Sequence, residues 1–371
     1  MGTDAAERDR ALMRAALALA RRGLGAVWPN PAVGCVIANE RGVVGRGWTQ
    51  PGGRPHAETE ALARAGAAAQ GATAYVTLEP CSHWGRTPPC ADALIAAGIG
   101  RVVAALEDPD PRVRGRGLRR LAAAGIAVET GLCAKEAEEL NTGFLSRIRR
   151  GRPLVTLKLA TTLDGRIATA SGESRWITGP SARARAHLLR AMHDAVMVGS
   201  GTVLADDPEL TCRLPGLADC SPVRVVLDTR LRTPPSARLV TTARLVPTWL
   251  LTAPDADPVR RVAFADRGVT VIEVPPDPAG GLDLAAALKA LGERGLTRVL
   301  VEGGAQLAAS LLRAGLVDRL LWFHAPRVIG GDGVPAIAAF DFDRLADAPS
   351  FERIAVEAVG DDVLTVLRVR P

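Results

Sequence analysis

The sequence predicts an α/β protein with two domains. Strand-like and helix-like segments alternate from one end of the chain to the other, which is the pattern of an α/β fold. The length of 371 residues exceeds one ordinary domain, since a domain takes roughly 100–200 residues. No apolar run approaches the roughly 20 residues of a membrane-spanning helix, so we expect a globular protein without membrane spans.

The first half is predicted to alternate helices and strands in a regular order. A helix over 4–22 is indicated by Leu12, Ala16 and Leu19, which recur at helical spacing. Two strands at 33–38 and 43–48 flank a turn. The remaining elements of this half are strands at 73–78, 101–106 and 126–130, and helices at 57–69, 90–97 and 115–124.

A charged segment with glycine and proline at 147–153 separates the two halves. We place the boundary there, with domains at 1–148 and 149–371. The second half is predicted to contain strands at 154–159, 195–198, 223–228, 248–251, 269–274, 298–302 and 320–323. The last segments, 354–357 and 363–369, are expected to form an antiparallel hairpin at a sheet edge.

Three potential metal ligands stand out in the first half: His56, Cys81 and Cys90. One histidine and two cysteines make a zinc set that leaves a fourth position for water, the arrangement of a catalytic site. Such an ion lowers the pKa of its water to about 7. Glu58, two residues after the histidine, can reach that water and carry its proton to a leaving amine. His-x-Glu followed by Pro-Cys after a strand is the logic of zinc deaminases.

The net charge of +6 raises the question of nucleic-acid binding. Only three of the 46 basic residues are lysines, the arginines are spread along every segment, and aromatic residues make up 4% of the chain. Nucleic-acid grooves combine clustered positive charge with stacking aromatic side chains. We therefore expect a small phosphorylated ligand and no nucleic acid. A deaminase that acts on nucleic acid through an appended binding domain stays the second hypothesis.

The N-terminus carries acidic residues and lacks the hydrophobic core of an export signal, so we expect a cytoplasmic protein. The six cysteines are then reduced thiols or metal ligands rather than a disulfide framework. Cys35, in the middle of a strand, is expected in the core. No metal partner is evident for the remaining cysteines, Cys133, Cys212 and Cys220.

Two motifs resemble the deaminase half of the bifunctional riboflavin-biosynthesis deaminase/reductase family. They are Pro29-Asn-Pro-Ala-Val-Gly-Cys35 and Glu79-Pro-Cys-Ser-His-Trp-Gly-Arg-Thr-Pro-Pro-Cys90. Eight residues separate the two motif cysteines, whereas cytidine and tRNA adenosine deaminases have two. The resemblance implies a cytidine-deaminase-like three-layer domain and, as substrate, 2,5-diamino-6-(ribosylamino)-4(3H)-pyrimidinone 5′-phosphate. It implies substrate contacts from Asn30, His83 and Arg86. A loop-packing role for His83 and a solvated Arg86 stay open.

A different signal in the second half is a strand that runs into Gly303-Gly304, with a helix beginning near Ala305. Such a turn lets a phosphate approach backbone N–H groups at a helix N-terminus. Read alone, it is weak evidence, and a plain tight turn stays the alternative.

The family resemblance continues through Lys158-Leu-Ala-Thr-Thr-Leu-Asp-Gly165, Gly172-Glu-Ser-Arg-Trp-Ile-Thr178, Gly199-Ser-Gly-Thr-Val-Leu-Ala-Asp-Asp-Pro208 and Val301-Glu-Gly-Gly304. It implies a dihydrofolate-reductase-like domain that uses NADPH to reduce ribose carbon 1′ of the deaminated product. By position, the implied cofactor contacts are Ala160, Trp176, Thr202, Asp206, Thr229, Gly304, Ala305, Gln306 and Leu307. The implied substrate contacts are Ser174, Arg190, Leu210, Arg213 and Glu302, and we add Lys158 as a group that orients sugar hydroxyls.

Residue chemistry supports several of these assignments. Arg190 and Arg213 suit a phosphate bidentately, and Trp176 offers a flat face for a nucleotide ring. The alternatives are ordinary ion pairs for Lys158 and Asp206 and core packing for Trp176. A second domain that has lost catalysis and serves oligomerisation is a third hypothesis.

The remaining histidines are not expected to take part in the chemistry. His187 and His193 are expected on a helix at a surface or interface, and His324 as a packed residue. We expect a homo-oligomer, either a dimer or a tetramer.

Overall fold

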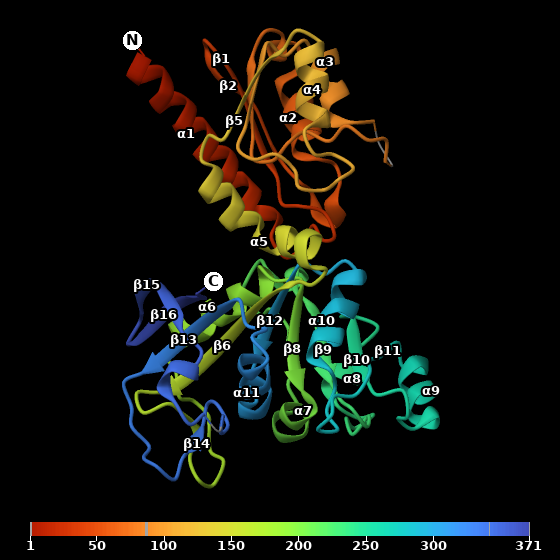
Figure 1. Ribbon diagram of the computed structural model, residues 1–371, viewed down its shortest axis with the longest axis vertical. Coiled ribbons are helices and arrows are strands. Elements are labelled where there is room, and N and C mark those ends of the chain that lie inside the picture. Colours follow the sequence, from red (N-terminus) through yellow and green to blue (C-terminus); the bar gives the residue numbers. More distant parts are fainter. Residues whose placement is uncertain (1, 86–87, 341, 371) are drawn as a thin grey trace. The chain divides into compact units, whose positions relative to one another are not determined.

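The computed structural model describes residues 2–85, 88–340 and 342–370. The chain divides into two compact units, Met1–Gly151 and Arg152–Pro371 (Figure 1). The predicted boundary between residues 148 and 149 lies inside helix α5 (Ala134–Arg150), an element that the sequence prediction missed. The helix runs into the charged segment and ends at Arg150, where Gly151, with a left-handed backbone at φ of 69°, caps it.

The first unit is built on a five-stranded sheet with the order β2-β1-β3-β4-β5. Strand β1 is antiparallel to β2 and β3, while β3, β4 and β5 are parallel to one another. All five strands were predicted, with bounds that differ by up to two residues. The strands are β1 (Gly34–Asn39), β2 (Gly42–Trp48), β3 (Thr73–Val76), β4 (Arg101–Ala104) and β5 (Ala127–Thr130).

Helices cover both faces of this sheet (Figure 1). On one face lie α5 and α1 (Gly2–Ala20); on the other lie α2 (Ala57–Ala65), α3 (Cys90–Ala96) and α4 (Arg116–Ala123). The alternation of β1 explains the layers: Val36 packs toward α1, whereas Cys35 and Ile37 pack toward α2 and α3. Cys35 is a fully buried core residue, as predicted. The predicted helix at 57–69 ends early, because Gly66–Ala69 form a 3₁₀ turn.

Helix α2, which carries Glu58, packs so closely against β2 that the contact sets the position of its first turn. A Cβ atom at Gly47 would lie 2.1 Å from the backbone oxygen of Ala57. Only glycine permits that approach, so the sequence of β2 determines where the first turn of α2 lies.

The second unit is built on a nine-stranded sheet with the order β11-β10-β9-β8-β12-β6-β13-β16-β15. The strands from β11 to β13 are all parallel, and β16 and β15 add an antiparallel hairpin at one edge, as predicted. These strands are β6 (Leu154–Thr162), β8 (Ala195–Gly199), β9 (Val223–Leu227), β10 (Thr248–Thr252), β11 (Thr270–Glu273), β12 (Arg298–Glu302), β13 (Arg319–Ala325), β15 (Phe351–Val359) and β16 (Asp362–Val369). A separate two-stranded sheet pairs β7 (Arg166–Ala168) with β14 (Val334–Pro335).

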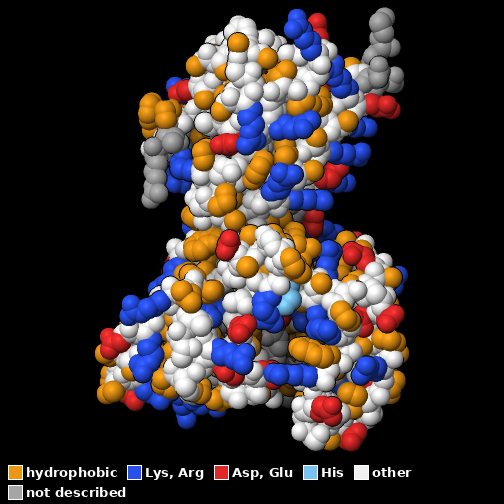
Figure 2. Space-filling view, turned by 180° about the vertical axis from the view of Figure 1, so that it is seen from behind, with side chains coloured by type: hydrophobic (Ala, Val, Ile, Leu, Met, Phe, Trp, Pro, Cys, Tyr) orange, Lys and Arg blue, Asp and Glu red, His pale blue; other side chains and the backbone are white. Residues whose placement is uncertain are grey.

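Helices connect the parallel strands of the second unit. They are α6 (Pro180–Ala191), α7 (Ser200–Asp206), α8 (Arg238–Thr241), α9 (Pro258–Asp266), α10 (Leu284–Glu293) and α11 (Ala305–Arg313). The start of α11 at Ala305 agrees with the sequence prediction. None of the helices in the described ranges is long and apolar enough to cross a membrane. On the face drawn in Figure 2, basic side chains are interspersed with acidic and apolar ones, which matches the spread of arginines along the sequence.

Candidate active sites

Three metal-ligating side chains meet in the first unit. The ligand atoms of His56, Cys81 and Cys90 all lie within 4.8 Å of one another. The Nδ1 atom of His56 lies 3.3 Å from the Sγ atom of Cys90 and 3.6 Å from that of Cys81. One imidazole and two thiols at these separations fit a zinc ion with a fourth position left for water.

The fold positions each of these side chains at the end of an element. His56 is the N-cap residue of α2, Cys90 is the first residue of α3, and Cys81 follows the end of β3. The backbone N–H of Cys90 donates to the Sγ atom of Cys81 at 3.3 Å. The first turn of a helix favours negative charge, so the start of α3 stabilises the thiolate form that a metal needs.

The local electrostatics shift the pKa values of the two thiols in opposite directions. Hydrogen bonds from Cys90 and His56 lower the pKa of Cys81 to about 4, despite its partial burial. The pKa of Cys90 is raised, first by its bond to the Cys81 thiolate and then by burial. The surroundings of Cys81 therefore favour its thiolate, which is the form of a cysteine that binds a metal.

Glu58 lies in the first turn of α2 and is 3% exposed. Burial, reinforced by the charge of Cys81, raises its pKa to about 7. A carboxyl group with this pKa can accept and return a proton near neutral pH. The structure thus places an acid-base group beside the three ligands.

A cavity of about 310 Å³ opens over this cluster. Two of the predicted substrate-binding residues, Asn30 and His83, line it, and Asn30 donates from Nδ2 to the backbone oxygen of Gly53 at 3.3 Å. The third, Arg86, lies outside the described residues. The Nδ1 atom of His83 is buried and has no hydrogen-bond partner within the described part of the chain.

Sequence reasoning missed a carboxylate-rich wall of the same cavity. It is formed by Asp108 and Asp110, with Arg112 donating to the carboxylate of Asp110. Burial raises the pKa of Asp108 to about 6. The only sequence signal was the Glu-Asp-Pro-Asp run after a strand, which is also typical of a turn.

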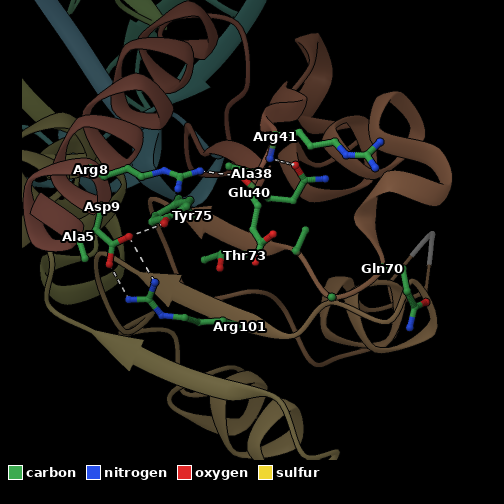
Figure 3. Close-up of a pocket in the computed structure, with 13 residues that line it drawn as sticks. Ala5, Arg8, Asp9, Ala38, Glu40, Arg41, Gln70, Thr73, Tyr75 and Arg101 are labelled. Carbon is green, nitrogen blue, oxygen red and sulfur yellow. Dashed lines mark hydrogen bonds and ion pairs between the residues drawn. The ribbon is translucent and has the colours of Figure 1, made fainter. Parts of the chain in front are cut away.

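A larger cavity of about 680 Å³ lies at the opposite end of β3, beside its first residue Thr73 (Figure 3). Some of its polar groups bind one another: Arg101 donates to Asp9 at 2.6 Å and to Glu129 at 2.9 Å, and Tyr75 also donates to Asp9. No group of three potential metal ligands lies there among the described residues. We interpret this network as a polar contact between α1 and the sheet that adds to their apolar packing.

In the second unit, three predicted substrate-binding residues meet at neighbouring strands. Lys158 of β6 is directly paired with Glu302 of β12 in the strand register, and its Nζ atom lies 3.8 Å from a Glu302 oxygen. Arg190 of α6 donates to the same carboxylate from Nε at 2.6 Å and Nη2 at 2.9 Å. Burial lowers the pKa of Lys158, whereas the two cations hold that of Glu302 at about 2 in spite of its burial.

The predicted cofactor contacts follow the carboxyl ends of adjacent strands. Thr229 follows β9, Thr202 lies in α7 after β8, and Gly304 follows β12. Gly303 and Gly304 have φ of 83° and 85°, and a Cβ at Gly304 would lie 3.4 Å from the Thr202 Oγ1 atom. Ligands of open parallel sheets bind at this edge, and the turn leaves the N-terminal backbone of α11 accessible beside Ala305, Gln306 and Leu307. Ala160 lies in β6 two residues beyond Lys158.

The other predicted residues are more peripheral. Trp176 is 61% exposed, which excludes the core-packing alternative, and the Arg183 guanidinium covers its ring at 4.6 Å. Ser174 precedes it in the same exposed loop. Leu210 is buried in the core, so any contact with a ligand comes from its backbone.

Two charged residues complete this set. Asp206 is exposed at the end of α7. Arg213 is exposed and paired with Glu209 at 3.1 Å, whereas the Nε and Nη2 edge of Arg190 is occupied by Glu302. Of the two arginines, Arg213 therefore has the more available fork for a phosphate.

The expectation for His193 is wrong. It is 5% exposed, with Nδ1 2.7 Å from the Leu189 oxygen and Nε2 3.1 Å from the Thr156 hydroxyl. Burial lowers its pKa to about 3, so it is a neutral core residue. His187 is half-buried on α6, and His324 stacks on Trp322 with a centroid separation of 5.4 Å.

Comparisons with known proteins identify both units. Residues 6–106 match the cytidine and deoxycytidylate deaminase zinc-binding region, and residues 153–365 match the RibD C-terminal domain. The chain is 47% identical over 366 residues to riboflavin biosynthesis protein RibD of Escherichia coli K12, covering 96% of this chain and 98% of the relative. It is 44% identical over 352 residues to RibD of Bacillus amyloliquefaciens, covering 95% and 94%.

Solved structures agree. RibD of Acinetobacter baumannii superposes with a TM-score of 0.89 at 40% identity, over 99% of this chain and 100% of that one. A diaminohydroxyphosphoribosylaminopyrimidine deaminase/5-amino-6-(5-phosphoribosylamino)uracil reductase of Thermotoga maritima superposes with a TM-score of 0.85 at 33% identity, over 98% and 99%. The chain therefore belongs to the RibD family and is a bifunctional deaminase and reductase of riboflavin biosynthesis.

Proposed function

We propose that the first unit deaminates 2,5-diamino-6-(ribosylamino)-4(3H)-pyrimidinone 5′-phosphate, and that the second unit reduces the product with NADPH to 5-amino-6-(ribitylamino)uracil 5′-phosphate. The observation that carries the first step is the cluster of His56, Cys81 and Cys90 with the buried Glu58 beside it. The Thermotoga maritima relative, whose name states both activities, supports the substrates.

In the deamination, His56, Cys81 and Cys90 would hold one zinc ion. Zinc supplies Lewis-acid activation of a water molecule. Glu58 would take a proton from the activated water as the water oxygen bonds to carbon 2. It would then deliver that proton to the amino group, whose bond to carbon 2 breaks so that ammonia leaves. Glu58 is buried in the first turn of α2, the helix that His56 caps, and this position places its carboxyl group close to the three ligands.

The cavity residues orient the pyrimidine and its sugar phosphate. Asn30 is proposed to hold the ring, because an amide can pair with a ring donor and a ring acceptor at once. His83 is proposed to contact the ribose or the phosphate, because its buried Nδ1 atom has no partner among the described residues and the side chain lines the cavity. Arg86, in the same loop, is proposed as a phosphate ligand on the resemblance alone.

In the reduction, NADPH supplies a hydride to carbon 1′ of the ribosyl chain. Its phosphates are proposed to bind the turn at Gly304 and the first turn of α11, beside Thr202 and Thr229. The other proposed contacts are Ala160, Trp176, Asp206, Ala305, Gln306 and Leu307.

The substrate of this step is proposed to lie over Lys158 and Glu302, with Arg190 fixing the Glu302 carboxylate. Arg213 is proposed to bind the phosphate, because its fork is exposed. Ser174 and the backbone of Leu210 complete the proposed substrate contacts.

The expected homo-oligomer, a dimer or a tetramer, and the cytoplasmic location stay predictions. Analytical ultracentrifugation measures the first and fractionation of the source cells the second.

The reaction order is tested by incubating purified protein with the diamino substrate, with and without NADPH. We expect ammonia release in both reactions, and loss of NADPH in the reaction that contains it. Ammonia release that requires NADPH would contradict deamination as an independent first step.

A further inference from the structure

Glu79 is a buried carboxylate that the deamination mechanism above does not use. It lies two residues before the metal-ligating Cys81 and is 4% exposed. A buried carboxylate is costly unless its oxygens are well hydrogen-bonded, so the groups that bind it show what it does.

The partners of Glu79 are all backbone N–H groups of one segment, 107–118, which comprises most of the loop after β4 and the first turn of α4. Its Oε2 atom accepts from Asp108 at 3.1 Å and from Gly115 at 2.8 Å. Its Oε1 atom accepts from Gly117 at 2.9 Å, with a longer contact to Leu118 at 3.4 Å.

Through these contacts the Glu79 side chain caps the N-terminus of α4, although Glu79 lies far from α4 in the sequence. Helix α4 begins at Arg116, and its N-cap residue, Gly115, offers no side-chain cap. Gly117 and Leu118 are the second and third residues of the helix, and their N–H groups have no partner within it. The negative charge of Glu79 also suits the positive end of the helix dipole.

A second feature holds the same segment against the ligand turn. A Cβ atom at Gly117 would lie 2.0 Å from the backbone oxygen of Pro80, between Glu79 and Cys81. Helix α4 therefore begins in direct contact with the turn that carries Cys81. The segment before it contributes Asp108, Asp110 and Arg112 to the cavity wall.

We propose that Glu79 is a positioning residue for the deaminase. Its carboxylate holds segment 107–118 on the Pro80–Cys81 turn, so that the cavity wall keeps its place relative to the metal ligands. Glu79 also lines the cavity, but both of its oxygens are bonded to backbone N–H groups, so we assign it a positioning role and no contact with the reacting atoms. This proposal rests on the proposed function, because it takes the cavity as the place of the pyrimidine.

The test compares Glu79→Gln with Glu107→Gln, which changes an exposed carboxylate of the same segment. The amide keeps the size of Glu79 but presents N–H groups to N–H donors and removes the charge. For Glu79→Gln we expect about one zinc per chain and a deaminase kcat within about threefold of the parent, but a KM at least tenfold higher. Amide exchange in 107–118 is expected to become faster. Glu107→Gln is expected to behave as the parent in all four measurements.

Gly117→Ala provides an independent variant, because it displaces the segment without altering the carboxylate. We expect the same rise in KM with zinc retained. NADPH oxidation with deaminated substrate, a reaction of the other unit, is expected to stay unchanged in all three variants.

Three results would overturn the proposal: loss of zinc in Glu79→Gln, a fall in kcat with KM and exchange unchanged, or no change at all. Failure of the proposed function shows itself separately, because the unaltered protein would then release no ammonia from the diamino substrate.

Discussion

The replacement Glu302→Gln tests the ionic cluster of the reductase unit. In the parent, one buried carboxylate accepts two hydrogen bonds from Arg190 and lies near Lys158. Glutamine keeps the volume but leaves two buried cations without a counter-charge. Breaking a buried pair in this way is strongly destabilising.

The magnitude follows from the Glu302 pKa. Its fall from 4.5 to about 2 corresponds to about 3 kcal/mol of stability at pH 7, at about 1.4 kcal/mol per tenfold change in proton affinity. Because the folded pKa is the lower one, this contribution is complete above pH 4.5 and is lost as the pH falls toward 2. It is about 2 kcal/mol at pH 3.5.

Urea unfolding at equilibrium measures the difference in the free energy of unfolding at several pH values. Hydrogen exchange in peptides from residues 152–371 detects the unfolding of the second unit. Glu293→Gln, at an exposed position of α10, is the matched control. We expect the free energy of unfolding of Glu302→Gln to lie about 3 kcal/mol below that of the control at pH 7. At pH 3.5 this difference should be about 2 kcal/mol. A gap below about 0.5 kcal/mol, or one that does not depend on pH, would refute the reasoning.

Three further predictions concern single side chains. Cys81→Ser should lose zinc in metal analysis, and one equivalent remaining would contradict the ligand set. Arg213→Ala should raise the KM of the reductase step about tenfold with little effect on ammonia release, and a joint fall of both steps would contradict separate sites. The neutral, buried His193 has a pKa lowered from 6.5 to about 3, so the free energy of unfolding should fall by about 2 kcal/mol between pH 6.5 and 5. His193→Gln should remove this part of the slope in urea unfolding, and an unchanged slope would show that other groups cause it.

Local patterns were sufficient for much of the fold. Alternation and turn residues predicted every strand of the two main sheets, because burial on one or both faces imposes a pattern that a short window can show. Helix α5 was missed because charged residues surround its few apolar positions. Those positions, Ala137, Leu140, Phe144 and Leu145, recur at helical spacing and are all buried.

The metal site was predictable because its residues lie in short motifs, His-x-Glu and Pro-Cys, even though those motifs are far apart in the sequence. His56 and Glu58 are two residues apart on one helix turn, so the motif itself carries their geometry. Glu79 carries no such signal, because its donors come 29 to 39 residues later and are backbone groups of any residue type. His193 was misplaced for the same reason: it follows α6, and its partner Thr156 lies 37 residues earlier, on β6.

The variant Glu58→Gln, assayed for both activities, tests the central claim most directly. With the diamino substrate it should retain about one zinc per chain and release ammonia at least a thousandfold more slowly than the parent. With deaminated substrate it should oxidise NADPH at the parental rate. Undiminished ammonia release would contradict Glu58 as the proton carrier, and loss of NADPH oxidation would contradict two independent active sites on one chain.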